Sequence, residues 1–390
     1  MTDDITSDLA VVFGQPSQMT SSFTSSSIRR QMTEVLSRLR RVLNKCTAQR
    51  TTICLLSSVF CLLGCGKEPL YQEQGFVFGT LVEVSVYGES EPRAKQAVIE
   101  VLQEFQRLHD MLHAWQPSEL NELNAAFANG ESEAASAELV AILQDATQLS
   151  QQSKGLFNPA LGGLVQLWGF HADEFKPVLP DEKQIAKWVE ANPQMSDISI
   201  EHGRAQSRNK SVQLDLGGYA KGYALDRAAE LLRKQGINNA LINIGGNVLA
   251  LGQHGNHPWR VGIQHPRKPG SLATLDLNDG EAIGTSGDYQ RYFMLGNVRY
   301  SHLINPRSGY PMQGVQAVTI LTSGVRAGVL SDAASKPLFI AGASGWREAA
   351  RQMGLSEAML VDGQGNIHLT AAMQKRLEFS EKIFRLQVEP

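Results

Sequence analysis

The sequence predicts a single domain of the mixed α+β class, and three observations carry that prediction. Residues 82–86 alternate between valine and polar side chains, which is typical of a half-buried strand. Residues 92–112 place apolar side chains at the spacing of an amphipathic helix. Further segments of both kinds follow without a regular strand-helix-strand rhythm, which favours an α+β arrangement over a doubly wound parallel sheet.

The expected elements follow one another along residues 76–370. Helices are expected at 92–112, 118–126, 136–150, 219–235 and 331–341. Strands are expected at 76–87 (interrupted at Gly79-Thr80), 211–216, 239–251 (around a Gly-Gly pair), 259–264, 282–286, 298–302, 317–322, 359–361 and 367–369. Residues 155–170 are glycine-rich and apolar, and the proline-containing stretch after them predicts a loop with a short helix.

The N-terminal part of the chain predicts a lipoprotein signal. The cysteines all fall in one short window: Cys46, Cys54, Cys61 and Cys65. Basic residues precede an apolar stretch, 53–63, which has the length of a signal-peptide core and is too short to span a bilayer as a helix. The stretch ends in Leu62-Leu63-Gly64-Cys65, which resembles a bacterial lipobox. We therefore expect lipidation at Cys65 and membrane attachment through acyl chains.

Two other interpretations of this window are a short buried helix and half of a metal-binding knuckle. The knuckle is disfavoured because no second cysteine pair follows. A signal is favoured because the mature chain would keep only its lipidated cysteine, as suits an oxidising compartment. We expect an extension and signal at 1–64, a tether at 65–74 and one domain at 75–390. The Ser/Thr-rich start indicates either a disordered extension or translation from Met32.

Composition and charge exclude one class of partner. With 42% hydrophobic and 19% charged residues, the composition is that of a globular protein. The formal net charge is -3, and no basic stripe stands out in the globular part. No nucleic-acid partner is therefore expected.

The densest chemical motif is Leu-Asp-Leu-Gly-Gly-Tyr-Ala-Lys-Gly at 214–222. A strand is expected to deliver Asp215, two glycines let the backbone turn close to a ligand, and a helix begins with Lys221 in its first turn. Backbone N–H groups at a helix start, together with a lysine, favour a phosphorylated ligand. The motif is neither a Walker A loop nor G-x-G-x-x-G, and an ordinary strand-turn-helix joint is the alternative.

Two further loops have the same character. Ile244-Gly245-Gly246-Asn247 interrupts a strand with two glycines. Residues 284–289, Gly-Thr-Ser-Gly-Asp-Tyr, are expected to form a tight, exposed turn that carries two hydroxyls and an acid. Each loop alone is compatible with an ordinary turn, whereas three in one domain indicate a shared, phosphate-rich site.

His302 and Asp332 are the remaining candidates. His302 ends a strand beside a proline-containing turn, and a side chain that titrates near neutrality suits proton transfer. A structural histidine is the alternative. Asp332 opens an apolar helix, where it either caps that helix or binds a divalent metal.

Taken in order, these segments resemble the ApbE family of FAD:protein FMN transferases over residues 74–370. The matching segments are Phe78-Gly79-Thr80, Phe157-Asn158-Pro159, 167–170, 214–222, 243–247, 285–289, 301–306 and the helix of Asp332. The resemblance implies a domain of mixed sheets with flanking helices, similar to the T-fold. Exported lipoproteins are frequent among bacterial members, which agrees with the expected signal.

The resemblance also implies roles for individual residues. Those implied to contact FAD are Phe78, Leu156, Phe157, Asn158, Asp215, Lys221 and Ile304. The backbone of Gly218 and the side chain of Asp332 would hold Mg²⁺. His302 would accept the proton of the incoming hydroxyl.

The sequence departs from the family in the expected metal helix. Members usually carry Asp-x-x-x-Thr, with both side chains on the metal, whereas Lys336 takes the threonine position here. Ser335 stands where a second acid can occur. An ammonium one turn after Asp332 shares its helix face, so we expect metal binding to be weakened. Phe78 in place of methionine and Asn305 in place of aspartate are milder departures.

The implied reaction is Mg²⁺-dependent phosphoryl transfer. A serine or threonine hydroxyl of an acceptor protein attacks the FMN-side phosphorus of FAD, and AMP leaves. The implied acceptors are flavoprotein subunits of membrane redox complexes, such as quinone reductases, on the periplasmic side of a bacterial membrane. Gly66 after the lipidated cysteine favours the outer membrane. The alternatives are an FAD pyrophosphatase that uses the same site and a non-catalytic FAD-binding lipoprotein.

Overall fold

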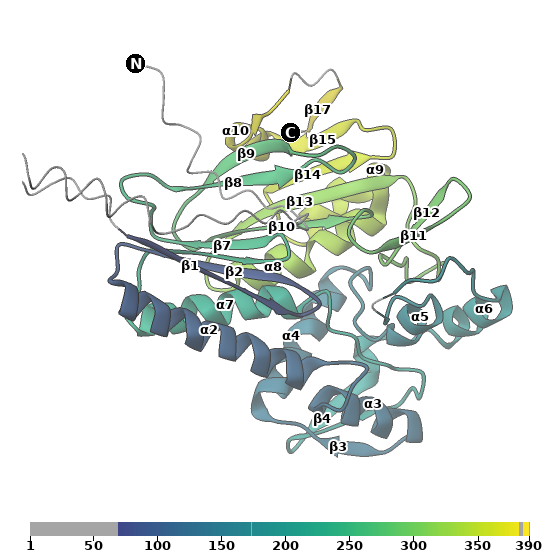
Figure 1. Cartoon of the computed structure of the whole chain (residues 1–390). Coiled ribbons are helices and arrows are strands. Elements are labelled where there is room, and N and C mark those ends of the chain that lie inside the picture. Colours follow the sequence, from purple (N-terminus) through teal and green to yellow (C-terminus); the bar gives the residue numbers. More distant parts are fainter. Residues whose placement is uncertain (1–68, 173, 382–384, 390) are drawn as a thin grey trace, which may run out of the picture. The chain divides into compact units, whose positions relative to one another are not determined.

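The structure is a computed structural model that describes residues 69–172, 174–381 and 385–389. The predicted signal, Cys65 and the first part of the tether lie outside the described residues. Sheets and helices are interleaved along the described chain without a βαβ repeat, which confirms the predicted α+β class (Figure 1).

In the described part of the chain, the main sheet has nine strands in the order β1-β2-β6-β7-β10-β13-β14-β15-β17. Neighbouring strands are antiparallel, except that β15 and β17 run parallel. The strands are β1 (Leu70–Val77), β2 (Thr80–Tyr87), β6 (Ala240–Ile244), β7 (Asn247–Leu251), β10 (Glu281–Gly287), β13 (Val315–Ser323), β14 (Glu357–Asp362), β15 (Ile367–Thr370) and β17 (Leu386–Glu389). Because β2 pairs with β6 and β7 with β10, the sheet joins segments that are distant in sequence.

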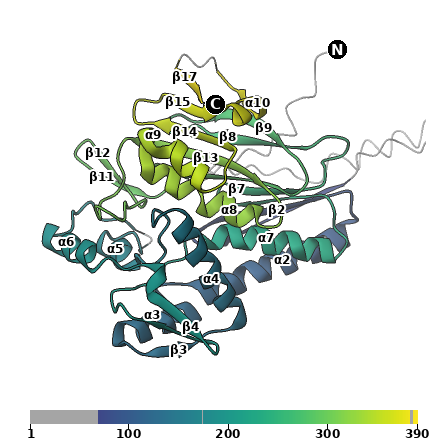
Figure 2. The same cartoon turned by 180° about the vertical axis from the view of Figure 1, so that it is seen from behind.

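One face of this sheet is covered by helices (Figures 1 and 2). They are α2 (Glu91–Leu112), α7 (Ala220–Lys234), α8 (Ala327–Ala333) and α9 (Ser335–Gln352). Helices α2 and α7 pack on the half of the sheet that contains β1, β2, β6 and β7, and α8 and α9 pack on β10, β13 and β14. The buried residues of α2 recur every three or four positions, from Ala94 to Leu112, so the apolar stripe predicted from the sequence is the face that packs.

The opposite face is covered by a second sheet of β8 (Trp259–Gln264), β9 (Ser271–Leu277) and β16 (Glu378–Phe379). Every second residue of β8 is buried, which is the period of a strand with one covered face. Val261 and Leu275 of this sheet share an apolar cluster with Val248 and Leu321 of the main sheet. The short helix α10 (Ala371–Arg376) packs beside β14 and β15.

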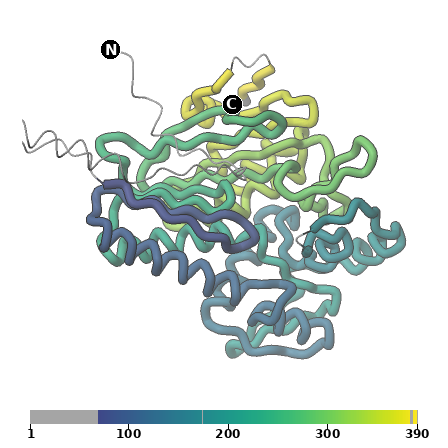
Figure 3. The backbone as a smooth tube through the Cα atoms, in the orientation of Figure 1, coloured from purple at the N-terminus to yellow at the C-terminus, as the bar shows by residue number. Residues whose placement is uncertain are grey.

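The remaining elements form two smaller groups, whose path is followed most easily in Figure 3. One contains α3 (Glu119–Asn129), α4 (Ala137–Gln152), η1 (Met195–Asp197) and a sheet of β3 (Ser132–Ala134), β5 (Arg204–Ser207) and β4 (Ile198–Glu201). The other contains α5 (Gly162–Leu167), α6 (Glu182–Ala191) and the hairpin of β11 (Tyr292–Leu295) and β12 (Val298–Ser301).

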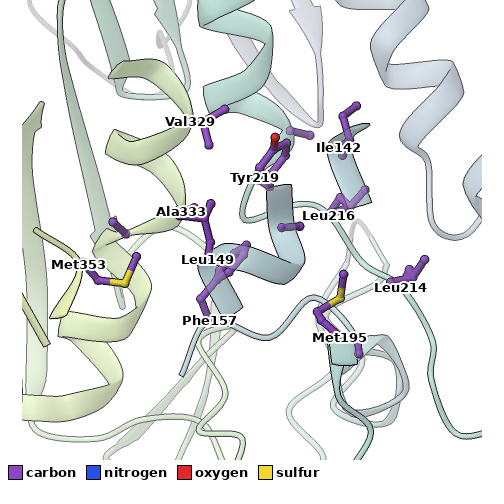
Figure 4. Packing of buried hydrophobic residues seen from close by; sticks show 14 of the residues in the cluster. Ile142, Leu149, Phe157, Met195, Leu214, Leu216, Tyr219, Val329, Ala333 and Met353 are labelled. Carbon is purple, nitrogen blue, oxygen red and sulfur yellow. The ribbon is translucent and has the colours of Figure 1, made fainter. Parts of the chain in front are cut away.

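A single apolar cluster joins α4, the start of α7 and helices α8 and α9. Figure 4 shows Leu149, Phe157 and Ala333 close together, with Tyr219 and Leu216 beside them. These five side chains are at most 4% exposed. The loop before α7 is therefore anchored in the core at Leu216 and Tyr219, while Gly217 between them is exposed.

Several predicted elements differ from the structure in their limits. The expected strands 76–87 and 239–251 are two hairpins, β1–β2 and β6–β7, and residues 70–74, expected as tether, belong to β1. The predicted strand at 211–216 is wrong, because this segment has only an isolated bridge from Gln213 to Leu161. The predicted helix 331–341 begins earlier and is broken between α8 and α9. Within the described residues, no helix has the length and apolar character that a membrane span needs.

Candidate active site

The loop that leads into α7 is held by hydrogen bonds to neighbouring segments. The backbone of Leu214 pairs with the side-chain amide of Asn124, at 2.6 and 3.0 Å, and Asp215 N donates to Pro159 O at 2.8 Å. Asp215 Oδ1 accepts from Gly217 N at 2.8 Å. The carboxylate thus fixes the turn that its own motif predicts, and α7 begins directly afterwards, with Lys221 in its first turn.

The pKa of the Asp215 carboxyl is set by opposing effects of its surroundings. Burial raises its pKa, while the Gly217 N–H and the charges of Arg291, Lys221 and His113 act to lower it. These residues come from α7, from the segment before β11 and from the end of α2. The structure therefore gathers around Asp215 residues from distant parts of the sequence.

Asp332 lies in α8 with a side chain that is 1% exposed. Its Oδ2 accepts from Gly222 N of α7 at 3.1 Å, and its Oδ1 lies 3.5 Å from Lys221 Nζ. The prediction that Asp332 caps its own helix is wrong, since α8 already begins at Ala327 and the carboxylate bonds to α7 instead. Burial acts to raise the pKa of Asp332, but the ammonium groups of Lys221 and Lys336 hold it well below its usual range.

Lys336, in the first turn of α9, reaches back across the junction between α8 and α9. Its Nζ forms an ion pair with the Asp332 carboxylate and donates to Asp332 O at 2.7 Å. Ser335 Oγ donates to the same carbonyl at 2.7 Å and lies 2.7 Å from Ser286 Oγ. Burial lowers the pKa of Lys336 to about 8, although Asp332 acts in the opposite direction. The lysine is protonated at neutral pH.

Gly218 lies directly beside this pair. A Cβ on Gly218 would be 3.2 Å from Lys336 Cε and 3.8 Å from Phe157 Cε2. The absence of a side chain at Gly218 therefore lets the loop lie close to both residues. The segment 214–222 and the helix of Asp332 are therefore in direct contact.

His302 follows β12, and its ring is bonded to the backbone of Arg291. Its Nδ1 lies 3.2 Å from Arg291 O, which assigns the proton to Nδ1 and leaves Nε2 as an acceptor. Burial and the nearby charges of Arg291, Lys221 and Lys336 lower the pKa of His302 to about 3. The imidazole is therefore neutral at pH 7, the state that accepts a proton.

Two hairpin turns lie side by side at one end of the sheet. Phe78 and Gly79 connect β1 and β2 with φ values of 56° and 68°, and Gly245 and Gly246 connect β6 and β7. A Cβ on Gly245 would lie 2.6 Å from Thr80 Oγ1, so only glycine allows this contact. Since a bulky residue at positive φ is a backbone outlier, Phe78 carries strain of the kind found at functional positions.

Phe78 is linked to the centre of the site through His109 of α2 and His113, which follows that helix. Its ring contacts that of His109, with centroids 5.7 Å apart, and His109 in turn contacts His113 at 5.1 Å. His113 acts electrostatically on Asp215. The structure thus places Phe78 on the Asp215 side of the site.

The other residues implied to contact FAD lie in or beside the core. Leu156 is half-buried, Phe157 is 4% exposed and Ile304 is 7% exposed. Asn158 uses its side chain within its own loop, where Nδ2 donates to Pro193 O at 2.9 Å and Oδ1 accepts from Ala160 N at 3.1 Å. Ile304 packs with Trp168, Phe170 and other apolar residues in a cluster beside the β11–β12 hairpin.

The predicted exposed turn at 284–289 is wrong. Residues 281–287 form β10 in the middle of the main sheet, and Asp288 is buried in ion pairs with Arg267 at 2.7 Å and Arg299 at 3.3 Å. The segment still supports the site, because Ser286 bonds to Ser335 beneath Asp332. Its small residues are required by packing, since a Cβ on Gly284 would lie 2.2 Å from Ser331 O.

The residues at Asp332 do not fit the Mg²⁺ that the resemblance implies. Mg²⁺ needs near-octahedral oxygen ligands, of which the protein supplies one or two carboxylates. Of the ligands that the resemblance implies, the threonine hydroxyl is replaced by the ammonium group of Lys336, which is itself paired with the Asp332 carboxylate. Both carboxylate oxygens of Asp332 already have N–H partners. A metal ion bound there would also lie beside the ammonium groups of Lys221 and Lys336, and like unit charges 4 Å apart repel by about 4 kcal/mol at an effective dielectric of about 20.

Arg291 and His113 are site residues that sequence reasoning missed. Arg291 Nη2 donates to Phe170 O at 2.9 Å, which fixes the arginine between the aromatic cluster and His302. His113 follows α2 and accepts from Trp115 N at 3.1 Å. Neither residue belongs to a motif, and only the packing of α2 and of the hairpin brings them to Asp215.

Comparison with known proteins agrees with this fold. Residues 78–360 match the ApbE family. An FAD:protein FMN transferase of Rhodobacter capsulatus is 43% identical over 313 residues, which are 80% of this chain and 59% of that protein, so the chain spans about three fifths of that relative. An FAD:protein FMN transferase of Klebsiella pneumoniae (strain 342) is 30% identical over 318 residues, 80% of this chain and 94% of the relative.

Solved structures show the same fold. The ApbE protein of Thermotoga maritima superposes with a TM-score of 0.72 at 27% identity, over 80% of this chain and 100% of the other. The flavinyl transferase ApbE of Pseudomonas stutzeri, in its apo form, gives a TM-score of 0.69 at 26% identity, over 82% and 100%. Since the family match covers most of the chain and the fold agrees, the chain belongs to the ApbE family of flavin transferases.

Proposed function

We propose that this chain transfers the FMN moiety of FAD to a serine or threonine hydroxyl of an acceptor protein and releases AMP. Besides family membership, one structural observation supports this proposal. At the start of α7, the Gly218 backbone, Lys221 and Lys336 gather next to a neutral His302, while the Gly217 N–H is bonded to Asp215. A diphosphate needs that combination of N–H groups and positive charge, and the attacking hydroxyl needs a proton acceptor beside it.

The chain's own residues divide the work. The helix start and the two lysines bind and orient the diphosphate, because helix N-termini and ammonium groups favour anions. His302 Nε2 accepts the proton of the acceptor hydroxyl, and the Nδ1 bond to Arg291 O keeps the ring in that tautomer. The half-buried Phe78 and the carboxyl of Asp215 contact the flavin-bearing part of the substrate.

The resemblance implies Mg²⁺ as a cofactor, but the residues around Asp332 do not fit a Mg²⁺ ion. The roles given above to the side chains therefore need no metal. The acceptors we propose are flavoprotein subunits of membrane redox complexes. We also propose that the protein is a periplasm-facing lipoprotein anchored at Cys65. The support for this location is the lipobox-like sequence after a signal-like apolar stretch.

The test incubates the full chain with FAD and a candidate acceptor subunit. We expect the acceptor to gain the mass of an FMN group less water, with one AMP released per modified acceptor. The same acceptor with its target threonine changed to alanine is the matched control. Release of AMP and free FMN without acceptor labelling would identify a pyrophosphatase, and stable retention of intact FAD would identify a non-catalytic flavin-binding protein.

A further inference from the structure

Asp332 is a buried carboxylate that is bonded to two lysine side chains. The side chains of Lys221 and Lys336 are 24% and 14% exposed, whereas that of Asp332 is 1% exposed. One carboxylate cannot neutralise two ammonium groups, so Asp332, Lys221 and Lys336 together carry excess positive charge, and the pKa of the other nearby carboxyl, Asp215, is raised by burial. Because shielded charges are stable only when they are paired, the excess points to an anionic ligand at this position.

Lys336 is held in place from several directions. Its Nζ bonds to the Asp332 carboxylate and, at 2.7 Å, to the Asp332 carbonyl. Its aliphatic stem lies beside Gly218, where a Cβ would be 3.2 Å from Lys336 Cε. The ammonium is therefore a fixed charge beside the glycine loop.

Lys221 and the start of α7 extend the same positive region. Lys221 Nζ lies 3.2 Å from Gly217 O and 3.5 Å from Asp332 Oδ1. Helix α7 is 15 residues long and begins at Ala220, so the positive end of its dipole adds to the two ammonium groups. These charges converge on the loop formed by Gly217 and Gly218.

We infer that the ammonium groups of Lys336 and Lys221 take the place of a divalent cation on the diphosphate of FAD, so that this chain acts without added metal. The inference rests on the proposed function, because it names how that site neutralises its substrate. Its basis is the departure at Lys336. The ammonium there is bonded to the carboxylate that a metal would need.

The transfer step balances without a metal or a redox partner. The acceptor oxygen forms a bond to the FMN-side phosphorus, and the bond from that phosphorus to the bridging oxygen breaks. AMP leaves with the bridging oxygen, and the hydroxyl proton passes to His302 and then to solvent. Negative charge grows on the leaving phosphate, where fixed ammonium groups stabilise it.

The first test measures FAD binding, by quenching of flavin fluorescence, in EDTA and again in excess MgCl₂. We expect the wild-type affinity to agree within about twofold between the two conditions. Lys336→Met should weaken binding by roughly tenfold or more in both, as loss of a charge-assisted hydrogen bond predicts. Lys336→Thr should bind weakly in EDTA and recover in MgCl₂. Lys268→Met, which removes a surface lysine paired with Glu381, is the matched control.

The second test measures acceptor labelling and AMP release under the same two conditions. Wild-type activity that is lost in EDTA and restored by MgCl₂ overturns the inference, as does wild-type FAD affinity that rises about tenfold with MgCl₂. Wild type that binds FAD equally in both conditions but never labels an acceptor contradicts the proposed function and leaves the charge role intact. These outcomes are decided by the wild type alone, so they hold even if Lys336→Met folds poorly. Lys336→Arg keeps a positive charge at this position and tests whether that charge is sufficient for FAD binding in EDTA.

Discussion

Gly222 of α7 and Gly328 of α8 lie so close together that neither position has room for a side chain. A Cβ on Gly222 would be 2.3 Å from Gly328 O, and a Cβ on Gly328 would be 2.4 Å from Gly222 O. This approach of the two helices brings Gly222 N to 3.1 Å from Asp332 Oδ2. The glycine contact therefore sets the position of Asp332 relative to the start of α7.

Gly222→Ala is expected to push α7 and α8 apart and to lower both activity and stability. The new methyl group would also lie 2.8 Å from Asp332 Cβ, so it cannot be accommodated by rotating a flexible side chain. We expect the free energy of unfolding to fall by about 1–3 kcal/mol, as for other overpacked cores. Urea denaturation measures it, with Gly262→Ala as control, since a Cβ there would lie 3.6 Å from its nearest neighbour. Equal effects of both substitutions would contradict the prediction.

Asp226 is expected to give a pH-dependent contribution to stability. Its carboxylate accepts from Gly328 N at 2.8 Å and Val329 N at 2.9 Å, and burial raises its pKa to about 6. Because the folded state holds this proton more tightly than the unfolded state, the contribution is present at pH 4 and is lost as the pH rises through 6. The destabilisation caused by Asp226→Asn should therefore shrink between pH 4 and pH 7 in urea titrations. A constant difference would count against the raised pKa.

His302 is expected to destabilise the fold in acid. Its pKa is about 3 in the folded protein, against an ordinary value of 6.5, so the unfolded chain takes up a proton first as the pH falls. The free energy of unfolding should drop more steeply between pH 7 and pH 5 in the wild type than in His302→Gln. Denaturant titrations at both pH values measure the slopes. Parallel slopes would show that His302 titrates normally.

The same substitution should abolish most of the transfer activity while leaving FAD binding in place. In the proposed reaction His302 acts on the acceptor hydroxyl, and general-base contributions are typically about 100- to 10,000-fold. Acceptor labelling and FAD fluorescence, measured on the same preparation of His302→Gln, separate the two functions. Loss of both in parallel would instead indicate a structural histidine.

Trp168 is expected to secure the segment that follows His302. Its Nε1 donates to Gly309 O at 2.8 Å, and its ring packs on Tyr300, with centroids 5.7 Å apart. Trp168→Phe leaves that carbonyl without its partner, so the free energy of unfolding should fall by about 1–3 kcal/mol. Thermal and urea unfolding measure the change. An unaltered midpoint would mean that solvent replaces the indole N–H.

The fold class and most helices follow from local patterns, because the period of apolar residues reports which face of each element is buried. The structure confirms the helices expected at 92–112 and 219–235. Strand pairing could not be predicted in the same way. Which hairpin lies beside which depends on contacts such as Gly245 against Thr80, and these have no local signature.

The error at 284–289 has a physical cause. Glycine, serine and aspartate are typical of exposed turns, but here the small residues are needed because α8 packs directly on the middle of β10. Sequence reasoning proposed site residues where they form motifs, as at Asp215 and Asp332, and the structure brings these two segments close to Lys221. Sequence reasoning missed Arg291, whose position depends on the β11–β12 hairpin rather than on neighbours in sequence.

The side-by-side hairpin turns at Phe78 and Gly245 also bear on the stage of folding at which the proposed FAD site is complete. The site combines the first hairpin of the described chain with Lys336 of α9, so its two ends are joined only by long-range pairing in the sheet. Such contacts form late, because the intervening chain must first be ordered. The proposed FAD site is therefore incomplete until α9 has packed on the sheet.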